Sequence, residues 1–471
     1  MKKIIYILIL LSLCSCNNFV DIVPKGKRIP KSVDDLAQIM NIAESDGNNS
    51  TPTHYSITNP AAMTDDIQYV KNGPIAPWIF SKISEPYRNK YTWAPYIYSV
   101  NEVDPDWNGL YRSNYFLNYV LEEIDNAEDG KANDRDDVKG QAYFHRAMNY
   151  FLLVNEYAVQ YNKSTAVSDL AVPLALESDI NKSHPRSTVE DVYQAILSDL
   201  QNATSLLKKD YNTYNHIPGL AAAYSLLART YLFMGDYDKA YIAANEALAK
   251  KSTLVDYNTI TLKVPTLGAA AGIVGYEINN TAINAEVMYM RQRTKNGESV
   301  MSEDLKSQFD KANDLRYKFF TPDIAILGMK GYNAALNYWQ HSGIMTVEVW
   351  LTKAEAALRK KNPDINEAIL ALDYVRQHRY LKATYVPTTE TDPAKLLATV
   401  LRERRLETRF NSLRWFDLKR LNKNASTAKT LVHTGGDVQY TLEPENPKYV
   451  LPIPLNVLQF QNLPQNPAPG R

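Results

Sequence analysis

Acidic and basic side chains gather in one short region, residues 402–420, whose residue types could support acid–base chemistry. Its members are Glu403, Arg404, Glu407, Arg414 and Asp417, which lie within a few helical turns of one another. Charges buried in proteins persist when they are paired, and such pairs can fix the register of the elements that carry them. We therefore interpret the region as an ion-pair network that holds the C-terminal helix against the scaffold, with Trp415 and Phe416 in the core beside it.

Signatures of catalysis are missing elsewhere in the sequence. It has no G-x-S-x-G elbow, no H-E-x-x-H motif and no Walker loop, and its 7 histidines are scattered singly. The acidic pairs Asp65-Asp66 and Asp136-Asp137 cannot be assigned as a glycosidase pair from their spacing. Residues 129–140 are acidic but lack the alternating ligands of a calcium loop. The sequence thus predicts no enzyme, no catalytic residue and no cofactor, and it leaves a structural calcium ion open.

Aromatic side chains could act differently, by stacking on a sugar. Tyr occurs 32 times and Phe 12 times, so aromatic surface with a polar tip is common. Sugars bind to flat apolar faces flanked by planar polar groups, which Trp and Tyr supply together with Asn, Asp, Gln and Arg. Trp107, Trp350 and Trp415 have core spacing on predicted helices and are set aside.

The candidate ligand-binding residues lie in stretches without helical periodicity. They are Trp78, Trp93, Tyr96, Tyr289, Arg291, Tyr332 and Trp339. Trp78 leads this group, because it follows Pro77 and precedes a polar segment. Trp93 has an alternative role, which is to pack on the helix predicted to begin at residue 106.

A regular scaffold must position these loops, and residues 219–252 show its unit. Two amphipathic helical patterns flank Gly235-Asp236, a turn made of a flexible residue and a capping residue. The register matches the tetratricopeptide repeat of about 34 residues. The matching positions are Tyr224, Leu227, Ala228, Tyr231, Ala240 and Ala247. One such repeat cannot bury its own apolar face, so the rest of the chain must supply neighbouring helix pairs.

Helical periodicity recurs in three blocks, at about 106–160, 188–252 and 345–411. Asp106 is the predicted N-cap of the first block, because its carboxylate could accept from the free N–H groups of the first turn. A further short helix is predicted over residues 31–40. These blocks predict a mainly α fold.

Two long irregular segments, 41–105 and 253–344, interrupt the blocks, and the tail from Leu431 is predicted to be rich in turns. Such long irregular stretches are usually functional surfaces or disordered, and the aromatic content here favours a functional surface. We predict tetratricopeptide-like helix pairs in an α-α superhelix, over about 106–252 and 345–420. The two irregular segments are predicted to form a loop-rich ligand-binding lobe on it.

The first residues predict export. Lys2 and Lys3 precede the apolar run Ile4–Leu13, which is too short to span a bilayer as a mature helix. The small residue Ser15 before Cys16 resembles the lipobox of bacterial lipoproteins. The alternative is an ordinary secretory signal.

The lipobox resemblance implies that residues 1–15 are a signal peptide and that Cys16 carries lipid. Residues 16–30 lack apolar periodicity and are predicted to be a tether, and residues 31–471 are predicted to be a single domain. Cleavage before Cys16 leaves no other cysteine, which predicts a mature chain without disulfides. More than one acyl chain makes such an anchor stable. Because 52 basic and 52 acidic residues cancel, no net field recruits nucleic acid or an anionic membrane.

Four stretches, in order along the chain, resemble the SusD/RagB family of surface nutrient-binding lipoproteins of Bacteroidetes. They are the lipidated start, with Cys16 and Phe19-Val20-Asp21-Ile22-Val23-Pro24; the segment 146–157, followed by a loop with Val172-Pro173-Leu174; the charged segment 404–420; and the tail, Leu451-Pro452-Ile453-Pro454 leading to Leu463-Pro464-Gln465-Asn466-Pro467. The family typically has a glycine near position 412, where this chain has Ser412.

The resemblance implies a surface-exposed outer-membrane lipoprotein that binds a glycan and delivers it to a SusC-like TonB-dependent transporter. Alternatives are a member of the same family that binds a peptide or another nutrient, a glycan hydrolase on this scaffold, and a purely protein-binding repeat module. The irregular segment 41–105 argues against the last of these, since repeat scaffolds bind through regular concave faces.

Overall fold

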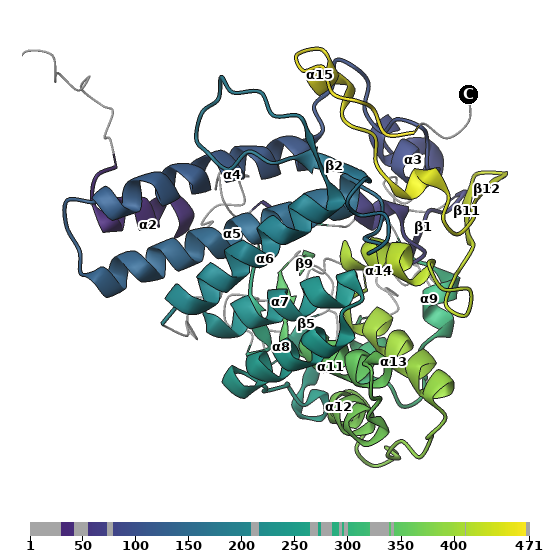
Figure 1. The fold of residues 1–471 in the computed structure, drawn as a ribbon. Coiled ribbons are helices and arrows are strands. Elements are labelled where there is room, and N and C mark those ends of the chain that lie inside the picture. Colours follow the sequence, from purple (N-terminus) through teal and green to yellow (C-terminus); the bar gives the residue numbers. More distant parts are fainter. Residues whose placement is uncertain are drawn as a thin grey trace, which may run out of the picture.

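The computed structural model describes residues 30–41, 55–72, 79–208, 216–263, 272–274, 285–291, 294–295, 300–320, 339–340, 343–409 and 411–467. Within these ranges the protein is mainly helical, as predicted (Figure 1). The longer helices are α4 (Pro105–Glu123), α5 (Ala132–Tyr157), α6 (Val189–Leu206), α7 (Leu220–Met234), α8 (Tyr237–Lys250), α11 (Thr346–Arg359), α12 (Ile365–Gln377), α13 (Pro393–Glu407) and α14 (Leu413–Leu421). None of the helices described is long and apolar enough to cross a membrane.

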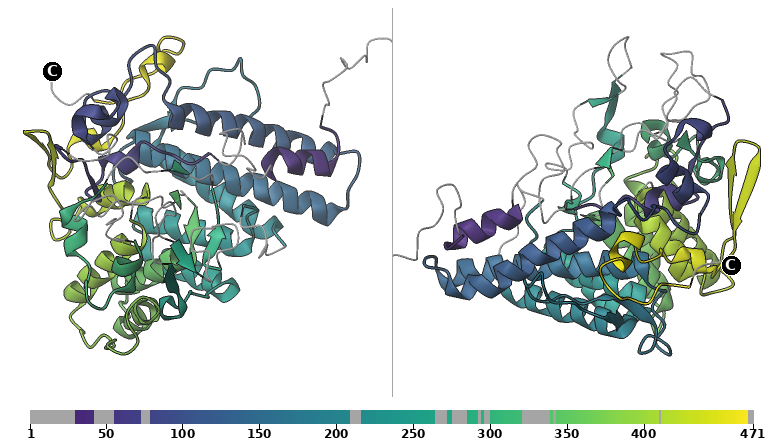
Figure 2. Two further views of the ribbon diagram at one scale, coloured as in Figure 1. Left: turned by 180° about the vertical axis from the view of Figure 1, so that it is seen from behind. Right: turned by 90° about the horizontal axis from the view of Figure 1, so that it is seen from above.

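These helices stack on one another in chain order. Helix α4 packs on α5, α5 on α6, α6 on α7, α7 on α8 and α8 on α11, which also contacts α12 and α13. Figures 1 and 2 show the same progression as a change of colour from blue through teal to green across the molecule. The arrangement confirms the predicted α-α superhelix of tetratricopeptide-like pairs.

The predicted repeat at 219–252 is the pair α7 and α8. Gly235 ends α7 with a φ of 75°, a left-handed conformation that favours glycine. Asp236 then caps α8, since its carboxylate accepts from the N–H of Lys239 at 3.2 Å. Small side chains on both helices are buried, namely Ala228, Ala240 and Ala247. Their size allows the two helix backbones to approach closely.

The N-cap of α4 is Asp104 and not Asp106, so that prediction was wrong by two residues. The carboxylate of Asp104 accepts from the N–H of Asp106 at 3.0 Å. Pro105 takes the first helical position, where its missing N–H and fixed φ are suitable. Asp106 is itself buried and accepts from the backbone N–H groups of Thr58 at 2.8 Å and Asn59 at 2.6 Å. It therefore ties an early loop to the scaffold.

Where the structure describes them, the two segments predicted to be irregular contain only short elements. The helical ones are η1 (Pro60–Met63), η3 (Phe80–Lys82), α3 (Glu85–Tyr91), η5 (Tyr257–Thr259), α9 (Glu303–Ser307) and α10 (Leu315–Phe320). The strands pair antiparallel in twos: β1 (Ile67–Gln68) with β8 (Val300–Met301), β4 (Thr261–Lys263) with β5 (Gly272–Val274), β6 (Val287–Tyr289) with β10 (Ile344–Met345), and β7 (Thr294–Lys295) with β9 (Trp339–Gln340). The β1–β8 pair joins the two segments directly.

The remaining short elements lie at the edges of the scaffold. Helix α2 (Val33–Asn41) agrees with the short helix predicted over residues 31–40, and it packs on α4 and α5. The loop between α5 and α6 contains the antiparallel pair β2 (Leu170–Pro173) and β3 (Arg186–Thr188). The 3-10 helices η4 (Ile124–Asn126) and η7 (Pro447–Tyr449) and the short helix α15 (Leu455–Leu458) complete the described elements.

The tail was predicted to be rich in turns from Leu431, but it begins with a β-hairpin. Strand β11 (Leu431–Gly435) pairs with β12 (Val438–Leu442). Leu431, His433 and Gly435 are buried while the residues between them are exposed, which is the alternation of a half-buried strand. The prediction was wrong because it weighed the prolines beyond residue 443 more heavily than this period of two.

Candidate ligand-binding site

The charged region 402–420 forms buried ion pairs. The guanidinium of Arg316 contacts Asp314 at 2.8 Å, Glu403 at 2.5 Å and Glu407 at 2.7 Å. Burial alone would raise the pKa of Glu403 and of Glu407, but the surrounding arginines outweigh it and lower both pKa values. In a separate cluster, Arg404 pairs with Asp417 at 2.8 Å. These charges are engaged with one another, which agrees with the structural interpretation of the region.

A further group of ion pairs in this region fixes an early loop to α14. Arg414 on α14 and Arg405 on α13 both contact Asp65, at 2.8 Å and 3.2 Å. Burial opposes the ionisation of Asp65, but the two arginines outweigh it and hold the pKa of its carboxyl well below the ordinary value. Trp415 and Phe416 are fully buried beside this contact, as predicted. These contacts therefore fix the position of helix α14 relative to the early loop and the core.

Lys419 on α14 reaches across to the C-terminal end of α5. Its ammonium nitrogen Nζ donates to the carbonyl oxygen of Asn155 at 2.5 Å and to that of Ala158 at 2.7 Å. Carbonyl groups at the end of a helix lack partners within the helix, so a lysine there satisfies them. Burial lowers the pKa of Lys419 to about 7, although Glu156 opposes this shift.

The tail folds back onto the same helix end. The side-chain amide of Asn466 donates to the carbonyl oxygens of Tyr157 at 2.8 Å and Leu451 at 2.7 Å. Its carbonyl oxygen accepts from Arg186 at 2.6 Å. Every polar atom of this side chain is used, so residues 451 and 466 are held in place at the end of α5.

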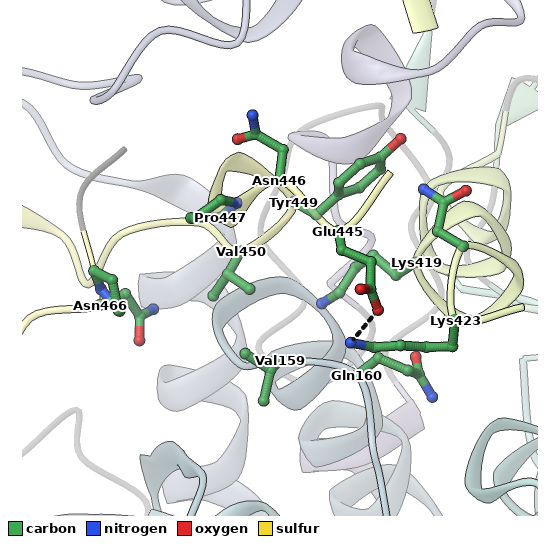
Figure 3. A pocket seen from close by; sticks show the side chains of 12 residues that line it. Val159, Gln160, Lys419, Lys423, Glu445, Asn446, Pro447, Tyr449, Val450 and Asn466 are labelled. Atoms are coloured by element: carbon green, nitrogen blue, oxygen red, sulfur yellow. Dashed lines mark ion pairs between the residues drawn. The ribbon is translucent and has the colours of Figure 1, made fainter. Parts of the chain in front are cut away.

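A pocket of about 200 Å³ lies between α14, the end of α5 and the tail. Figure 3 shows its side chains, which are Val159, Gln160, Lys419, Asn422, Lys423, Glu445, Asn446, Pro447, Tyr449, Val450, Asn466 and Pro467. We call it the tail pocket. Lys423 and Glu445 form an ion pair of 2.8 Å at its edge. Apolar walls and a few polar groups are the usual composition of a small-molecule site.

A narrow niche of about 20 Å³ adjoins the tail pocket and shares Val450, Asn466 and Pro467 with it. Tyr96 lines this niche from the early loop, together with Pro95. Tyr96 is half-buried. Of the predicted ligand-binding residues, it is therefore the one whose described side chain faces a hollow.

Trp93 lies in the core, and its alternative role in packing fits the structure better. Its indole is 1% exposed, stacks on His433 with ring centroids 4.2 Å apart, and donates to the carbonyl oxygen of Met63 at 3.0 Å. The opposite face of His433 stacks on Tyr91 at 4.1 Å. Trp93 presents no accessible face to a ligand, because the β11–β12 hairpin covers it.

Tyr289 and Arg291 are also buried. The Tyr289 hydroxyl and Nδ1 of His145 form a hydrogen bond of 2.9 Å, and Arg291 donates to the side-chain oxygen of Asn149. Both partners belong to α5, so the two residues fasten the end of β6 and the residues just after it to the scaffold. Because the side chains of Tyr289 and Arg291 are buried, they hold the loops against the scaffold and offer no surface to a ligand.

The other predicted residues cannot be placed. Trp78, Tyr332 and the lipidation residue Cys16 lie outside the described residues. The backbone of Trp339 pairs with Lys295 in the β7–β9 pair, and its side chain lies outside what is described.

A second hollow, of about 330 Å³, lies where β1, the start of α9 and β11 meet. Its charged groups are already engaged: Lys429 contacts Asp65 and Asp304, at 2.7 Å each. A ligand would have to compete with these pairs, which favours the tail pocket as the candidate site. Among the described residues no group of three His, Cys, Asp or Glu side chains could hold a metal ion.

Sequence reasoning missed Lys419, Gln160 and Tyr449 as site residues. Lys419 lies within the charged region that was interpreted as structural, and Gln160 lies just beyond the end of α5. Tyr449 lies in the proline-rich tail, which was predicted to form turns and not a site. The signal that could have found these site residues is the tail, because its prolines and amides form one of the four characteristic stretches of the sequence.

A superhelix of helix pairs that carries loops and a ligand-sized pocket at its tail defines a helical-repeat protein of the binding type. Residues 34–232 match the family model described as starch-binding associating with outer membrane, and residues 346–468 match that of the SusD family. The chain belongs to the SusD/RagB family.

Relatives agree with this assignment. The SusD-like protein P2 of Formosa agariphila is 26% identical over 407 residues, which cover 73% of this chain and 75% of that protein. Among solved structures, a SusD superfamily protein from Bacteroides thetaiotaomicron has a TM-score of 0.69 at 21% identity, covering 93% of this chain and 100% of its own. A putative sugar binding protein from Bacteroides vulgatus has a TM-score of 0.69 at 21% identity, with 94% and 100% covered. A SusD-like carbohydrate binding protein from Bacteroides vulgatus has a TM-score of 0.60 at 19% identity, with 89% and 94% covered. At these identities the structures show that the fold is shared.

Proposed function

We propose that the protein is held at the outer membrane by lipid on Cys16, binds a glycan on the outer surface of the cell, and passes it to a SusC-like TonB-dependent transporter. The family description, which combines starch binding with association to the outer membrane, supports both the ligand class and the location. Two similar structures are described as sugar or carbohydrate binding proteins, which supports the same ligand class.

The observation that carries the proposal is the tail pocket with its adjoining niche. Tyr96, Val450 and Pro467 offer apolar surface for the C–H face of a sugar ring. Lys419 and Gln160 stand at the same pocket with polar atoms for the hydroxyl edge. Such a site binds by contact alone, and the proposal includes no bond-breaking step.

Isothermal titration calorimetry of the purified protein against a panel of neutral and acidic polysaccharides tests the proposal. We expect saturable binding of at least one glycan. Silence across the panel, together with binding of a peptide digest, would contradict the glycan assignment and favour the peptide-binding alternative. Release of reducing ends during the incubation would favour the hydrolase alternative.

The transporter partner needs a separate measurement. Solubilised outer membranes from the native organism are passed over the tagged protein, and the retained proteins are identified by mass spectrometry. We expect a TonB-dependent transporter in the retained fraction. Its absence under mild detergent, with the glycan present, would contradict the proposed delivery.

A further inference from the structure

Among the polar atoms at the tail pocket that are buried without a hydrogen-bond partner, one belongs to Gln160. The side-chain nitrogen of Gln160 donates to the carbonyl oxygen of Phe233 at 2.6 Å, which fixes the orientation of the amide. A flipped amide would place two carbonyl oxygens against each other. The Gln160 oxygen Oε1 has no hydrogen-bond partner among the described residues, and the residue is 6% exposed. A buried acceptor of this kind costs stability until a donor reaches it.

Lys419 brings a donor to the same pocket. An ammonium group has three N–H bonds, and the carbonyl oxygens of Asn155 and Ala158 account for two of them. The described residues offer no hydrogen-bond acceptor to the third. Figure 3 shows the amine of Lys419 reaching from α14 to a place among the lining side chains Val450, Glu445 and Lys423.

The charges around the pocket leave a positive excess. Lys423 and Glu445 neutralise each other at the edge, where their side chains are 46% and 55% exposed. Glu156 lies near Lys419 on α5, but burial and the neighbouring acids Asp106 and Asp104 raise its pKa well above the ordinary value, which disfavours its charged form. Protonated Lys419 therefore has little negative charge to compensate it on the side of the pocket.

We propose that the tail pocket binds a single sugar unit that carries a carboxylate, such as the terminal uronate of an acidic glycan. The carboxylate accepts from Lys419, a ring hydroxyl donates to Oε1 of Gln160, and the apolar face of the ring lies on Val450 and Pro467. This inference rests on the proposed glycan-binding function and narrows its substrate class. The volume of about 200 Å³ is below the roughly 300–1,000 Å³ of sites for larger ligands, which suits one sugar unit.

Proton uptake is a distinctive consequence. Burial holds the pKa of Lys419 at about 7, so the free protein is only partly protonated there at neutral pH. A carboxylate beside the amine favours the charged form and raises its pKa. Binding near pH 7.5 must therefore take up protons from the buffer. The groups that face Lys419, namely Glu156, Lys423 and Glu445, belong to α5, the turn after α14 and the loop before η7.

The test compares an oligogalacturonate or oligoglucuronate with its methyl ester, in which a neutral ester replaces each carboxylate. Calorimetry of the whole protein is run in two buffers of different ionisation enthalpy. We expect the acid to bind roughly tenfold more tightly than the ester, as one charge-assisted hydrogen bond implies. We also expect an enthalpy that depends on the buffer, because protons are taken up.

Two variants and one control locate the effect. Lys419→Met should bring the two affinities to within about twofold of each other and abolish the proton uptake. Because this variant also loses two hydrogen bonds at the end of α5, Gln160→Glu provides an independent check. The negative charge that Gln160→Glu adds should weaken binding of the acid more than binding of the ester. Lys395→Met, which removes an exposed lysine on α13, should leave both affinities as in the unchanged protein.

The outcomes separate this inference from the proposed function. Equal binding of acid and ester, or a preference that survives both pocket variants, would overturn the uronate subsite while glycan binding stands. Binding of free peptides in place of any glycan, lost when their C-terminal carboxylate is amidated, would show that the pocket takes a carboxylate but that the glycan proposal is wrong. Binding of no ligand at all would contradict both.

Discussion

The guanidinium of Arg414 and the carboxylate of Asp65 face each other through two hydrogen bonds of 2.8 Å, although 349 residues separate them in the chain. Both side chains are buried. The pair joins the early loop to α14, the helix that also carries Lys419. Positioning of the tail pocket and anchoring of the early loop therefore depend on the same helix.

Breaking this pair should destabilise the protein strongly. Arg414→Met leaves the carboxylate of Asp65 buried with fewer cations around it, and the expected loss is about 3–5 kcal/mol in the free energy of unfolding. Urea titration followed by circular dichroism measures it. Lys71→Gln, which breaks the exposed pair with Asp437, is the control and should cost less than about 1 kcal/mol. Similar losses in both variants would show that the buried pair has no special role.

Glu156 should make stability depend on pH. Burial, with Asp106 and Asp104 nearby, raises its pKa, so the native state holds a proton that the unfolded state releases above roughly pH 4.3. Its contribution is fully present below that pH and is lost as the pH rises toward the native pKa. Glu156→Gln cannot titrate. Its stability relative to the unchanged protein should therefore increase between about pH 5 and about pH 8 in urea titrations. A constant difference would contradict the raised pKa.

Gly109 on α4 should not tolerate a methyl group while Tyr55 is present. A Cβ at this position would lie 2.7 Å from the Tyr55 ring, whose hydroxyl donates to Asp106 at 2.8 Å. Gly109→Ala should cost about 1–3 kcal/mol in the free energy of unfolding, because the ring must move. In a Tyr55→Ala background the same substitution should stabilise by about 0.5–1 kcal/mol, since alanine favours the helix. A double-mutant cycle measures the difference, and additivity would exclude the contact.

Tyr96 should contribute to glycan affinity and not to folding. Tyr96→Ala removes a half-exposed ring at the niche, and one aromatic contact of this kind is worth about 1 kcal/mol, or roughly fivefold in affinity. Calorimetry with the best ligand of the panel measures it. Tyr115→Ala, which removes a 37% exposed tyrosine from α4, is the matched control. An unchanged affinity would remove Tyr96 from the site.

Cys16 should determine attachment to the membrane. Cys16→Ala removes the thiol that accepts the lipid, so the protein should move from the membrane pellet to the soluble fraction and should no longer incorporate labelled fatty acid. Cys14→Ala, two residues earlier, is the matched control and should remain attached. Attachment of the Cys16 variant would favour a different anchor, and a soluble unchanged protein would favour an ordinary secretory signal.

Local patterns were sufficient to predict the scaffold. Helix α12, from Ile365 to Gln377, lies within the helical block predicted over about 345–411 from the spacing of apolar residues. The cap of α4 was misplaced because Asp104 and Asp106 are both good caps, and only the position of Pro105 decides between them. The choice of a helix cap depends on one or two neighbouring residues, so the sequence predicts the start of a helix closely.

The candidate site depends on contacts that a linear reading does not contain. The residues around Trp93 in the sequence are typical of a platform for a sugar ring. In the structure, His433, which is far away in the sequence, stacks on the Trp93 ring and shields it from solvent. Gln160 and Lys419 meet only because the tail and α14 converge on the end of α5. Periodicity reports which face of an element is buried, and it does not report which distant element covers that face.

The bond from Asn466 to Tyr157 spans 309 positions of the chain. Closure of the end of α5 must therefore wait until residue 466 has been made, and contacts of such long range form slowly. The tail therefore completes this end of the scaffold late in folding, in addition to forming a wall of the pocket.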